Sequence, residues 1–422
     1  MTSPIQDFWN SIFVNLVGIF AIIVVVYVNI RFSKFSILNI VYTFSIFWGF
    51  LILGTQWILN YKLETSFLLL MYSIPVLFNV VFLFIRLFLI NYQSNEKEPL
   101  ELFYKDRVWY VVMALFLLCL IANGIYVYNQ YYLKGIELVA LEQIRTSKFR
   151  LDNEEPNLFF NLFGRIYLLL LPWFYYLYGQ QKLNKGSLVA VVIINLLLSA
   201  VFLTRAPILI LCIYIMLCNS YFMDQKLAKK WNISLVISAA LIFVGISSII
   251  EGSFNEANGF LYNFKVYLFG GVGAFQNLVK GYRLVDPFAA NYFSTFDFVY
   301  YIEKKVGVIN SYPSYIRDYI DFGGHTTNVY TFLDSYFIDW GIIGVVLGSA
   351  VLFTITSIVF LLSTTSKKIV FFQIYLLFFS NIMMCFMNNE FIRISFFIML
   401  FQIILLWLLF LKKQQTISTE LK

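Results

Sequence analysis

The chain has 422 residues, of which 60% are hydrophobic and 13% charged, and its formal net charge is +7 at pH 7. Soluble domains carry about 25% charged residues, so this composition excludes a soluble protein and fits an all-α polytopic membrane protein. The basic residues form no arginine-rich arm, so the positive charge does not indicate a nucleic-acid partner.

Long apolar runs follow one another along almost the whole chain. A membrane-spanning helix needs about 20 consecutive apolar residues. By this measure the sequence predicts eleven transmembrane helices, at residues 11–30, 37–58, 66–90, 108–126, 158–178, 187–203, 207–222, 232–250, 340–362, 369–387 and 394–411.

The basic residues between these runs predict the orientation. No Lys or Arg precedes the first span, and Arg31 follows it, which favours a retained first helix with the N-terminus outside. With eleven spans, most lysines and arginines of the short segments fall on the cytoplasmic side. They are Lys34, Lys97, Lys105, Arg107, Lys182, Lys185, Lys226, Lys229, Lys230, Lys367, Lys368, Lys412 and Lys413. We therefore expect a multi-pass protein of the bacterial cytoplasmic membrane whose C-terminus is cytoplasmic.

The same count predicts one membrane domain, residues 1–422, with two large external loops at 127–157 and 251–339. The second loop is rich in aromatic residues, unlike a disordered linker. It is therefore predicted to form short helices on the bilayer surface or packed over the bundle, one of them within 295–309. Tyr and Trp residues near span ends, such as Trp173, Tyr175 and Tyr176, are expected to form interfacial belts.

Metal and nucleotide chemistry find no support in the sequence. The four cysteines lie in apolar runs without a C-x-x-C pair, and a chain with one histidine cannot form a multi-histidine metal site. Gly270-Gly271-Val-Gly273 lacks the preceding strand and the Lys-Ser/Thr of a phosphate-binding loop. We expect no metal and no cofactor.

Four arginines are candidate ligands for a diphosphate. Arg205 falls between two spans, just before Pro207 opens the next helix, where guanidinium and free N–H groups can hold phosphate; the alternative is a plain interfacial arginine. Arg165 lies inside an apolar run, where it binds a ligand, pairs with an acid or snorkels to the surface. Arg145 and Arg150 belong to a basic cluster of the first external loop that either holds diphosphate or is a solvated face.

His325 opens a polar stretch that runs into the ninth span. It is the only histidine, and its side chain suits proton transfer, although a lone histidine is more often structural. Asp339 is the second catalytic candidate, and its structural alternative is to cap the following helix or pair with an arginine. The other acidic candidates are Asp318, Asp321 and Asp334. Gly341, Gly344 and Gly348 are expected to allow close helix packing.

The pattern Asn328-x-Tyr330-Thr-x5-Phe337-x-Asp339-x-Gly341-x-x-Gly344, which ends a large external loop before the third-last span, resembles the bacterial oligosaccharide repeat-unit polymerases, the Wzy-type O-antigen polymerases. The Thr-Arg205 step and the segment Tyr267-x-x-Gly270…Ala274-Phe275 are similar to that family as well. The likeness covers the span layout of most of the chain, although the motifs are short.

The resemblance implies an integral-membrane glycosyltransferase of the GT-C type. Such an enzyme transfers a growing glycan from undecaprenyl diphosphate to a fresh lipid-linked repeat unit at the outer face of the membrane, without nucleotide sugar or metal. The arginines would stabilise the diphosphate leaving group, and His325 or a nearby carboxylate would accept the acceptor hydroxyl's proton. Asn328 and Tyr330 are expected to contact sugar. A chain-length regulator and a flippase of the same pathway are the expected protein partners.

Two other functions stay open at this point. An O-antigen ligase, which transfers glycan to lipid A core, shares the external-loop histidine and a similar glycine pattern. A flippase or transporter of lipid-linked oligosaccharide is the alternative from another class, against which stands the absence of a two-half repeat in the sequence.

Overall fold

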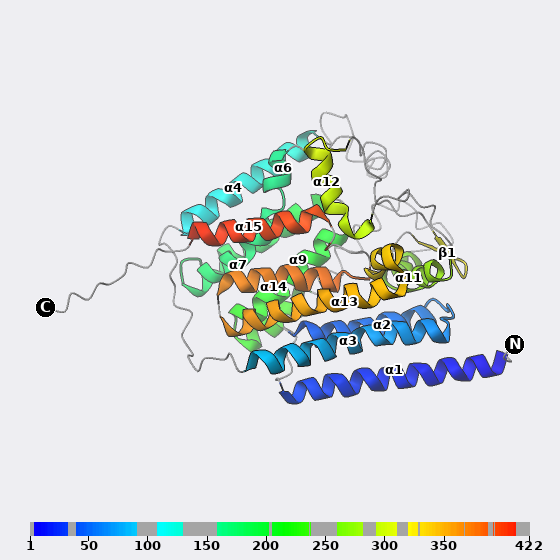
Figure 1. Cartoon of the computed structure of the whole chain (residues 1–422). Coiled ribbons are helices and arrows are strands. Elements are labelled where there is room, and N and C mark those ends of the chain that lie inside the picture. The colour runs from blue at the N-terminus through cyan, green and yellow to red at the C-terminus, as the bar shows by residue number, and fades with distance from the viewer. Residues whose placement is uncertain are drawn as a thin grey trace. The chain divides into compact units, whose positions relative to one another are not determined.

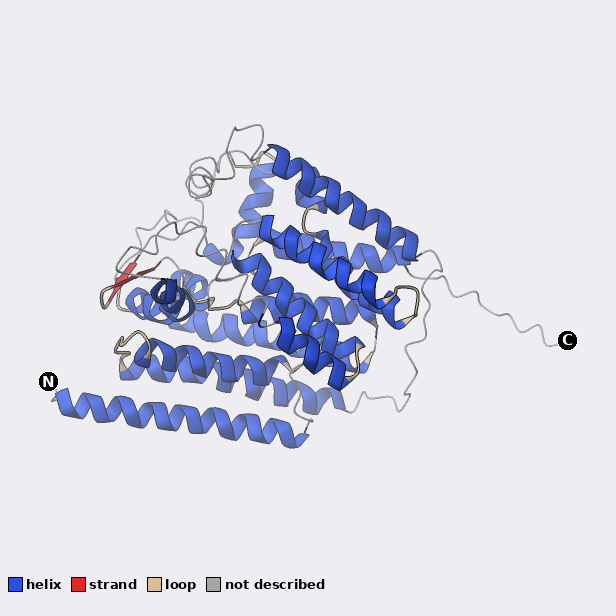
Figure 2. Ribbon diagram, turned by 180° about the vertical axis from the view of Figure 1, so that it is seen from behind, coloured by secondary structure: helices blue, strands red, loops and turns tan. Residues whose placement is uncertain are grey.

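The computed structural model describes residues 4–32, 39–90, 108–129, 158–201, 205–235, 237, 260–281, 293–309, 320–327, 330–366, 368–386, 391 and 393–410. Among these, five helices are long and apolar enough to cross a membrane, and five shorter helices are also apolar. Helices dominate both views of the chain (Figure 1, Figure 2). The protein is an all-α membrane protein, as its composition predicts.

The secondary-structure elements have the following bounds, in chain order. They are α1 (Pro4–Phe32), α2 (Ile40–Trp57), α3 (Thr65–Ile90), α4 (Val108–Val127), α6 (Leu158–Phe163), α7 (Ile166–Gly179), α8 (Lys185–Val201), α9 (Arg205–Phe222), α11 (Phe260–Val279), η3 (Ser294–Phe296), α12 (Asp297–Lys305), β1 (Ile320–Phe322), β2 (His325–Thr327), α13 (Leu333–Thr365), α14 (Ile369–Met383) and α15 (Ile394–Phe410). Helices lie at every predicted span except 232–250, most of which falls outside the described residues.

The chain divides into two compact units. The first comprises 1–94, 253–365 and 377–397, and the second comprises 95–252, 366–376 and 398–422. The single membrane domain inferred from the sequence stays a prediction, and each unit is described by itself.

Polar side chains join α1, α2 and α3 of the first unit, which lie side by side in Figure 1. Asn29 Nδ2 donates to Asn79 Oδ1 at 2.6 Å, and Asn79 Nδ2 donates to Ser45 Oγ at 2.8 Å. Towards the other end of α1, Tyr72 donates to Asn15 Oδ1 at 2.9 Å. Interhelical hydrogen bonds of this kind contribute about 0.6 kcal/mol each in membrane proteins, so these polar pairs set which faces meet.

An aromatic cluster forms the core of the same unit. Phe78 of α3 stacks on Phe353 of α13 with ring centroids 4.2 Å apart, and Phe44 of α2 contacts both rings. Trp48 is fully buried beside them and donates its indole N–H to Met71 O at 2.9 Å. The high aromatic content of the chain therefore fills helix–helix interfaces as well as its surface.

Helix α11 differs from the short surface helices expected in the second loop. It has 20 residues and a buried face that packs on α2, where Thr55 Oγ1 donates to Phe269 O at 2.8 Å. Its glycines allow this burial, because a Cβ on Gly271 would lie 2.4 Å from Phe386 O. The Gly-Gly-Val-Gly stretch thus serves packing. The expected helix within 295–309 is present as α12.

A sharp reversal interrupts α13 at Trp340 and Gly341. Gly341 has φ 62° and ψ −150°, a conformation available almost only to glycine. The preceding segment folds back so that a Cβ on Gly344 would lie 2.2 Å from Tyr336 O, and one on Gly348 would lie 2.6 Å from the Tyr336 ring. Gly344 and Gly348 therefore permit close packing as predicted. Gly341 does not, because nothing lies within 4 Å of its added Cβ.

In the second unit, the predicted span 158–178 is broken into α6 and α7 around Gly164 and Arg165. Backbone carbonyls near the break accept hydrogen bonds from side-chain amides. Asn123 Nδ2 donates to Gly164 O at 2.9 Å, and Gln402 Nε2 donates to Leu162 O at 2.5 Å. Freed backbone groups in a membrane helix need such partners, since hydrocarbon offers none.

The prediction of an interfacial aromatic belt is wrong for three residues of the second unit. Trp173, Tyr175 and Tyr176 are buried, and the Tyr175 hydroxyl donates to Asn219 Oδ1 at 2.6 Å. Trp173 packs on Phe410 with ring centroids 4.4 Å apart. These side chains belong to the core of the unit, because contacts with α9 and α15 cover the rings that the sequence analysis placed in an interfacial belt.

Substituting Gly341→Ala should destabilise the protein by about 1–3 kcal/mol, because alanine strains the reversal although space for its methyl group exists. The loss is measured as the fraction of monodisperse protein that survives heating in detergent. Gly124→Ala in α4 is the matched control, since its added Cβ also meets nothing within 4 Å and it lies inside a helix. Equal heat resistance of the two variants would contradict this account of the reversal.

Candidate functional site

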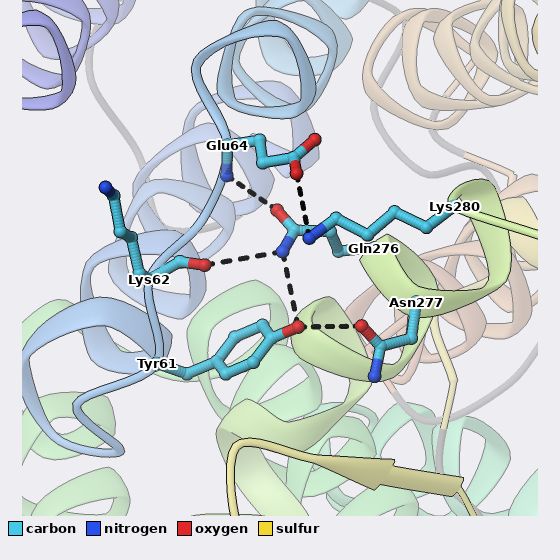
Figure 3. A network of polar contacts seen from close by, with 6 residues as sticks. All are labelled: Tyr61, Lys62, Glu64, Gln276, Asn277 and Lys280. Carbon is cyan, nitrogen blue, oxygen red and sulfur yellow. Dashed lines mark hydrogen bonds and ion pairs between the residues drawn. The ribbon is translucent and has the colours of Figure 1, made fainter. Parts of the chain in front are cut away.

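A network of polar side chains covers one end of the first unit, and we call it the polar cap. It joins three segments that are distant in sequence: the α2–α3 turn with Tyr61, Lys62 and Glu64, the C-terminal end of α11 with Gln276, Asn277 and Lys280, and the hairpin of β1 and β2. Figure 3 shows the first two of these segments.

Gln276 lies at the centre of the polar cap and is buried. Its Oε1 accepts the Glu64 backbone N–H at 2.7 Å, and its Nε2 donates to Tyr61 Oη and to Lys62 O, each at 3.3 Å (Figure 3). The carbonyl oxygen and the amino group of the Gln276 side chain thus both bind the α2–α3 turn. A buried amide without such partners costs about 1–3 kcal/mol, so this geometry is strongly favoured.

Asn277 extends the network from the turn to the hairpin. Its Oδ1 accepts the Tyr61 hydroxyl at 2.7 Å, and its Nδ2 donates to Asp321 O at 2.8 Å. Lys280 pairs with Glu64 at 2.9 Å, but the side chains are 31% and 56% exposed, so water screens this ion pair. The neutral hydrogen bonds therefore hold the segments together more firmly than the charges do.

The hairpin places His325 through a two-residue turn. Phe322 pairs with His325 across the strands, and Gly323 and Gly324 both have positive φ, as a tight hairpin turn requires. The Phe322 ring then packs edge-on against Tyr61, with centroids 5.2 Å apart. The sequence Phe-Gly-Gly-His thus explains why the only histidine meets the α2–α3 turn.

Both ring nitrogens of His325 have protein partners. Nε2 donates to Leu59 O at 2.8 Å, since a carbonyl can only accept, and Nδ1 shares a hydrogen bond of 2.9 Å with the Tyr262 hydroxyl. The ring is part-buried, and the hydrogen bond from Nε2 to Leu59 O ties it to the backbone just after α2. If the ring takes a proton from a substrate, Nδ1 must exchange Tyr262 for the incoming hydroxyl.

The Asp339 carboxylate binds the start of η3, which lies in the predicted second external loop. Its two carboxylate oxygens accept from Ser294 N at 2.8 Å, Ser294 Oγ at 2.9 Å and Thr295 N at 2.7 Å, and also from Thr295 Oγ1. The carboxylate thus holds the start of η3 against α13, a cap of a different helix from the one predicted. Its acceptor sites are largely occupied, which favours the structural alternative over proton transfer.

Residues 330–336, between His325 and Asp339, are buried. Tyr330 is fully buried, so contact with sugar would need this side chain to move, while Phe332 N donates to Cys385 O at 2.7 Å. Asp334 is also fully buried and accepts the Ser335 N–H in the first turn of α13. Asn328 lies outside the described residues.

The arginine candidates belong to the second unit. Arg165 is exposed and forms the N-cap of α7 at the helix break, while Arg205 is the first residue of α9. Arg145 and Arg150 lie outside the described residues. His325, Tyr330 and Asp339 are in the first unit, so the convergence of the arginines with them stays a prediction.

Sequence reasoning missed the amide pair Gln276–Asn277, Tyr262 and Arg86. The pair was visible as two adjacent polar residues after an apolar stretch with small residues. Its partners were not, because those in the α2–α3 turn lie 212 to 216 positions away and Asp321 lies 44 positions away. Arg86 lies within α3 near its end, and it was visible as a charge in an apolar run. Its guanidinium interacts with buried Tyr42 of α2.

Within the described residues, no cluster of three or more His, Cys, Asp or Glu side chains could hold a metal ion. Comparison of the chain with known protein families, with curated proteins and with solved structures gives no match. Any functional assignment therefore depends on the residues themselves.

Replacing Tyr61 by Phe should loosen the polar cap, because it removes a hydroxyl that bonds Asn277 and Gln276. We expect a loss of about 1–3 kcal/mol, seen as faster backbone hydrogen exchange in residues 58–64. Lys280→Met removes only the exposed ion pair and should cost about 0–1 kcal/mol. A larger effect of Lys280→Met than of Tyr61→Phe would contradict the order of strengths argued above.

Proposed function

We propose that the protein is an integral-membrane glycosyltransferase that polymerises undecaprenyl-diphosphate-linked oligosaccharide repeat units into O-antigen or a related surface polysaccharide. The reaction breaks the bond between the reducing-end sugar and the diphosphate of one lipid-linked glycan. A hydroxyl of a second lipid-linked repeat forms the new glycosidic bond and gives up its proton, and undecaprenyl diphosphate leaves.

One geometric observation carries this proposal. Both described candidate arginines stand at the N-terminal ends of apolar helices, Arg165 at α7 and Arg205 at α9. A helix N-terminus presents unpaired N–H groups and positive partial charge, and an adjacent guanidinium adds a full charge with paired donors. This combination suits a diphosphate, the group on which negative charge develops as the glycosidic bond breaks.

The proposal includes an orientation. Eleven spans of the GT-C type, with the N-terminus outside, put the starts of α7 and α9, the α2–α3 turn and the hairpin on the outer side of the cytoplasmic membrane. In support, the α2–α3 turn and the hairpin touch each other, which requires both segments to lie on the same side of the membrane. The motif from Asn328 to Gly344 supports the polymerase over the ligase.

Arg205→Ala should lower polymer formation by about 10²–10³-fold, the usual cost of removing one donor that stabilises developing charge. The assay uses purified protein with synthetic lipid-linked repeat units, and the product is a ladder of glycan lengths. Arg31→Ala is the matched control, because Arg31 lies in the last turn of α1 on the side assigned to the cytoplasm. A normal ladder from correctly inserted Arg205→Ala would remove Arg205 from the site.

A deletion strain separates the polymerase from the two alternatives. Surface glycan limited to one repeat unit supports a polymerase. Loss of surface glycan with accumulation of lipid-linked polymer would indicate a ligase. Accumulation of single repeats facing the cytoplasm would indicate a flippase.

A comparison of His325→Gln with Tyr262→Phe tests the imidazole as base. If His325 accepts the proton, His325→Gln should lower the rate by about 10²–10⁴-fold and remove the acidic limb of the pH–rate profile. Tyr262→Phe should keep that limb, since it frees Nδ1 and leaves the bond from Nε2 to Leu59. An unchanged pH profile in His325→Gln, with lower heat resistance, would assign His325 a purely structural role.

A further inference from the structure

Apolar side chains are exposed along η3, α12 and the residues that follow. Phe293, Phe296, Ile302, Val306 and Val308 are between 41% and 69% exposed, and Trp340 at the reversal in α13 is 44% exposed. We call these six residues the interfacial collar. So many large apolar side chains in one segment mark an interaction surface.

The η3 end of the collar is attached to α13 where the long apolar stretch of that helix begins. Asp339 fixes Ser294 and Thr295 by their backbone N–H groups. The ring of Phe293 stacks on Trp340 with centroids 5.8 Å apart, and Phe296 meets the same indole edge-on at 6.2 Å. The aromatic part of the collar therefore lies at the level of the reversal.

Helix α12 has one packed side and one exposed side. Phe298 packs on Phe397 of α15 with ring centroids 4.1 Å apart, and burial raises the pKa of the Asp297 carboxyl, an effect that Arg393 partly offsets. Ile302 and Val306, four positions apart, share an exposed side. Lys304 and Lys305 are exposed in the last turn.

The exposed surface continues directly into α13. After the reversal, Ile342, Ile343 and Leu347 are 54%, 71% and 60% exposed on a helix that is long and apolar enough to cross a membrane. The collar thus lies where a lipid-facing helix surface ends, with lysines beside it. Amphipathic helices with apolar side chains and lysines at such a level lie in the lipid headgroup region.

We propose that the interfacial collar docks into the lipid headgroup region, with Phe293, Phe296, Ile302, Val306, Val308 and Trp340 inserted and with Lys304 and Lys305 binding anionic headgroups. This inference goes beyond the proposed glycosyl transfer and does not rest on it. It assigns the η3–α12 segment a membrane partner of defined chemistry, an anionic lipid surface.

Nitroxide labels on single introduced cysteines test the insertion, in protein reconstituted into phosphatidylglycerol-containing vesicles. The four native cysteines are buried, so labelling is selective. Val306→Cys and Val308→Cys carry the test labels, with Ile343→Cys as lipid reference and Lys62→Cys, exposed in the α2–α3 turn, as water reference. The readout is label relaxation by oxygen, which partitions into lipid, against relaxation by a water-soluble nickel chelate.

Labels at 306 and 308 should follow the lipid reference, with relaxation by oxygen exceeding that by nickel. Labels that behave as at position 62 would overturn the proposal, because the collar would face water. Labels shielded from both reagents would overturn it as well, since another protein surface would then cover the collar.

The lysines are tested by repeating the measurement on the Lys304→Gln, Lys305→Gln double variant and in phosphatidylcholine vesicles. In phosphatidylglycerol the double variant should lower the inserted population of the 306 label by about two- to fivefold, and in phosphatidylcholine it should have no effect. Equal behaviour of both proteins in both lipids would overturn the assignment of anionic headgroups.

Discussion

The fold of the first unit depends on one constraint: the two amide side chains at the end of α11 are buried and must find hydrogen-bond partners. Gln276 and Asn277 find them in the α2–α3 turn and in the β1–β2 hairpin. An unpartnered buried amide costs more than a typical hydrogen bond gains, so the alternatives in which these segments separate are disfavoured. The position of the hairpin then determines where His325 lies, and with it the only imidazole available to any chemistry.

The same rule governs the irregular backbone of the second unit. Between α6 and α7, the side-chain amides of Asn123 and Gln402 donate to backbone carbonyls that a continuous helix would pair internally. The break exposes Arg165 at the start of α7, so an interruption in a membrane helix places a cation at the N-terminal end of an apolar helix. In membrane transporters, discontinuous helices point their half-helix N-termini at anionic substrate groups. The proposed diphosphate substrate would use the start of α7 in the same way.

Much of the fold could be predicted from the sequence, because the length of an apolar run is set by the thickness of the bilayer and does not depend on tertiary contacts. The amphipathic helix α12 was predicted for the same kind of reason, since its pattern is local. Helix α11 was not, because its buried face includes Gln276 and Asn277, whose partners lie more than 200 positions away or in the hairpin. The burial of Trp173 and Tyr175 and the strained conformation of Gly341 also depend on neighbours that no local pattern reveals.

For the candidate site, the sequence singled out His325, Asp339 and the arginines. It did not reveal the hydrogen bonds that the imidazole forms with Tyr262 and Leu59, or those that the Asp339 carboxylate accepts from Ser294 and Thr295. The joint site of arginines and imidazole is still a hypothesis.

The central claim is that the α2–α3 turn and the hairpin lie together at the outer face of the membrane. Labelling of single cysteines in intact cells with a membrane-impermeant thiol reagent tests it most directly, using Lys62→Cys in the turn, Asp321→Cys in the hairpin and Lys226→Cys before the eighth predicted span. All three positions are exposed. The account predicts that 62 and 321 react in intact cells and that 226 reacts only after permeabilisation. Reaction of 62 and 321 from opposite sides, or of both only after permeabilisation, would contradict it.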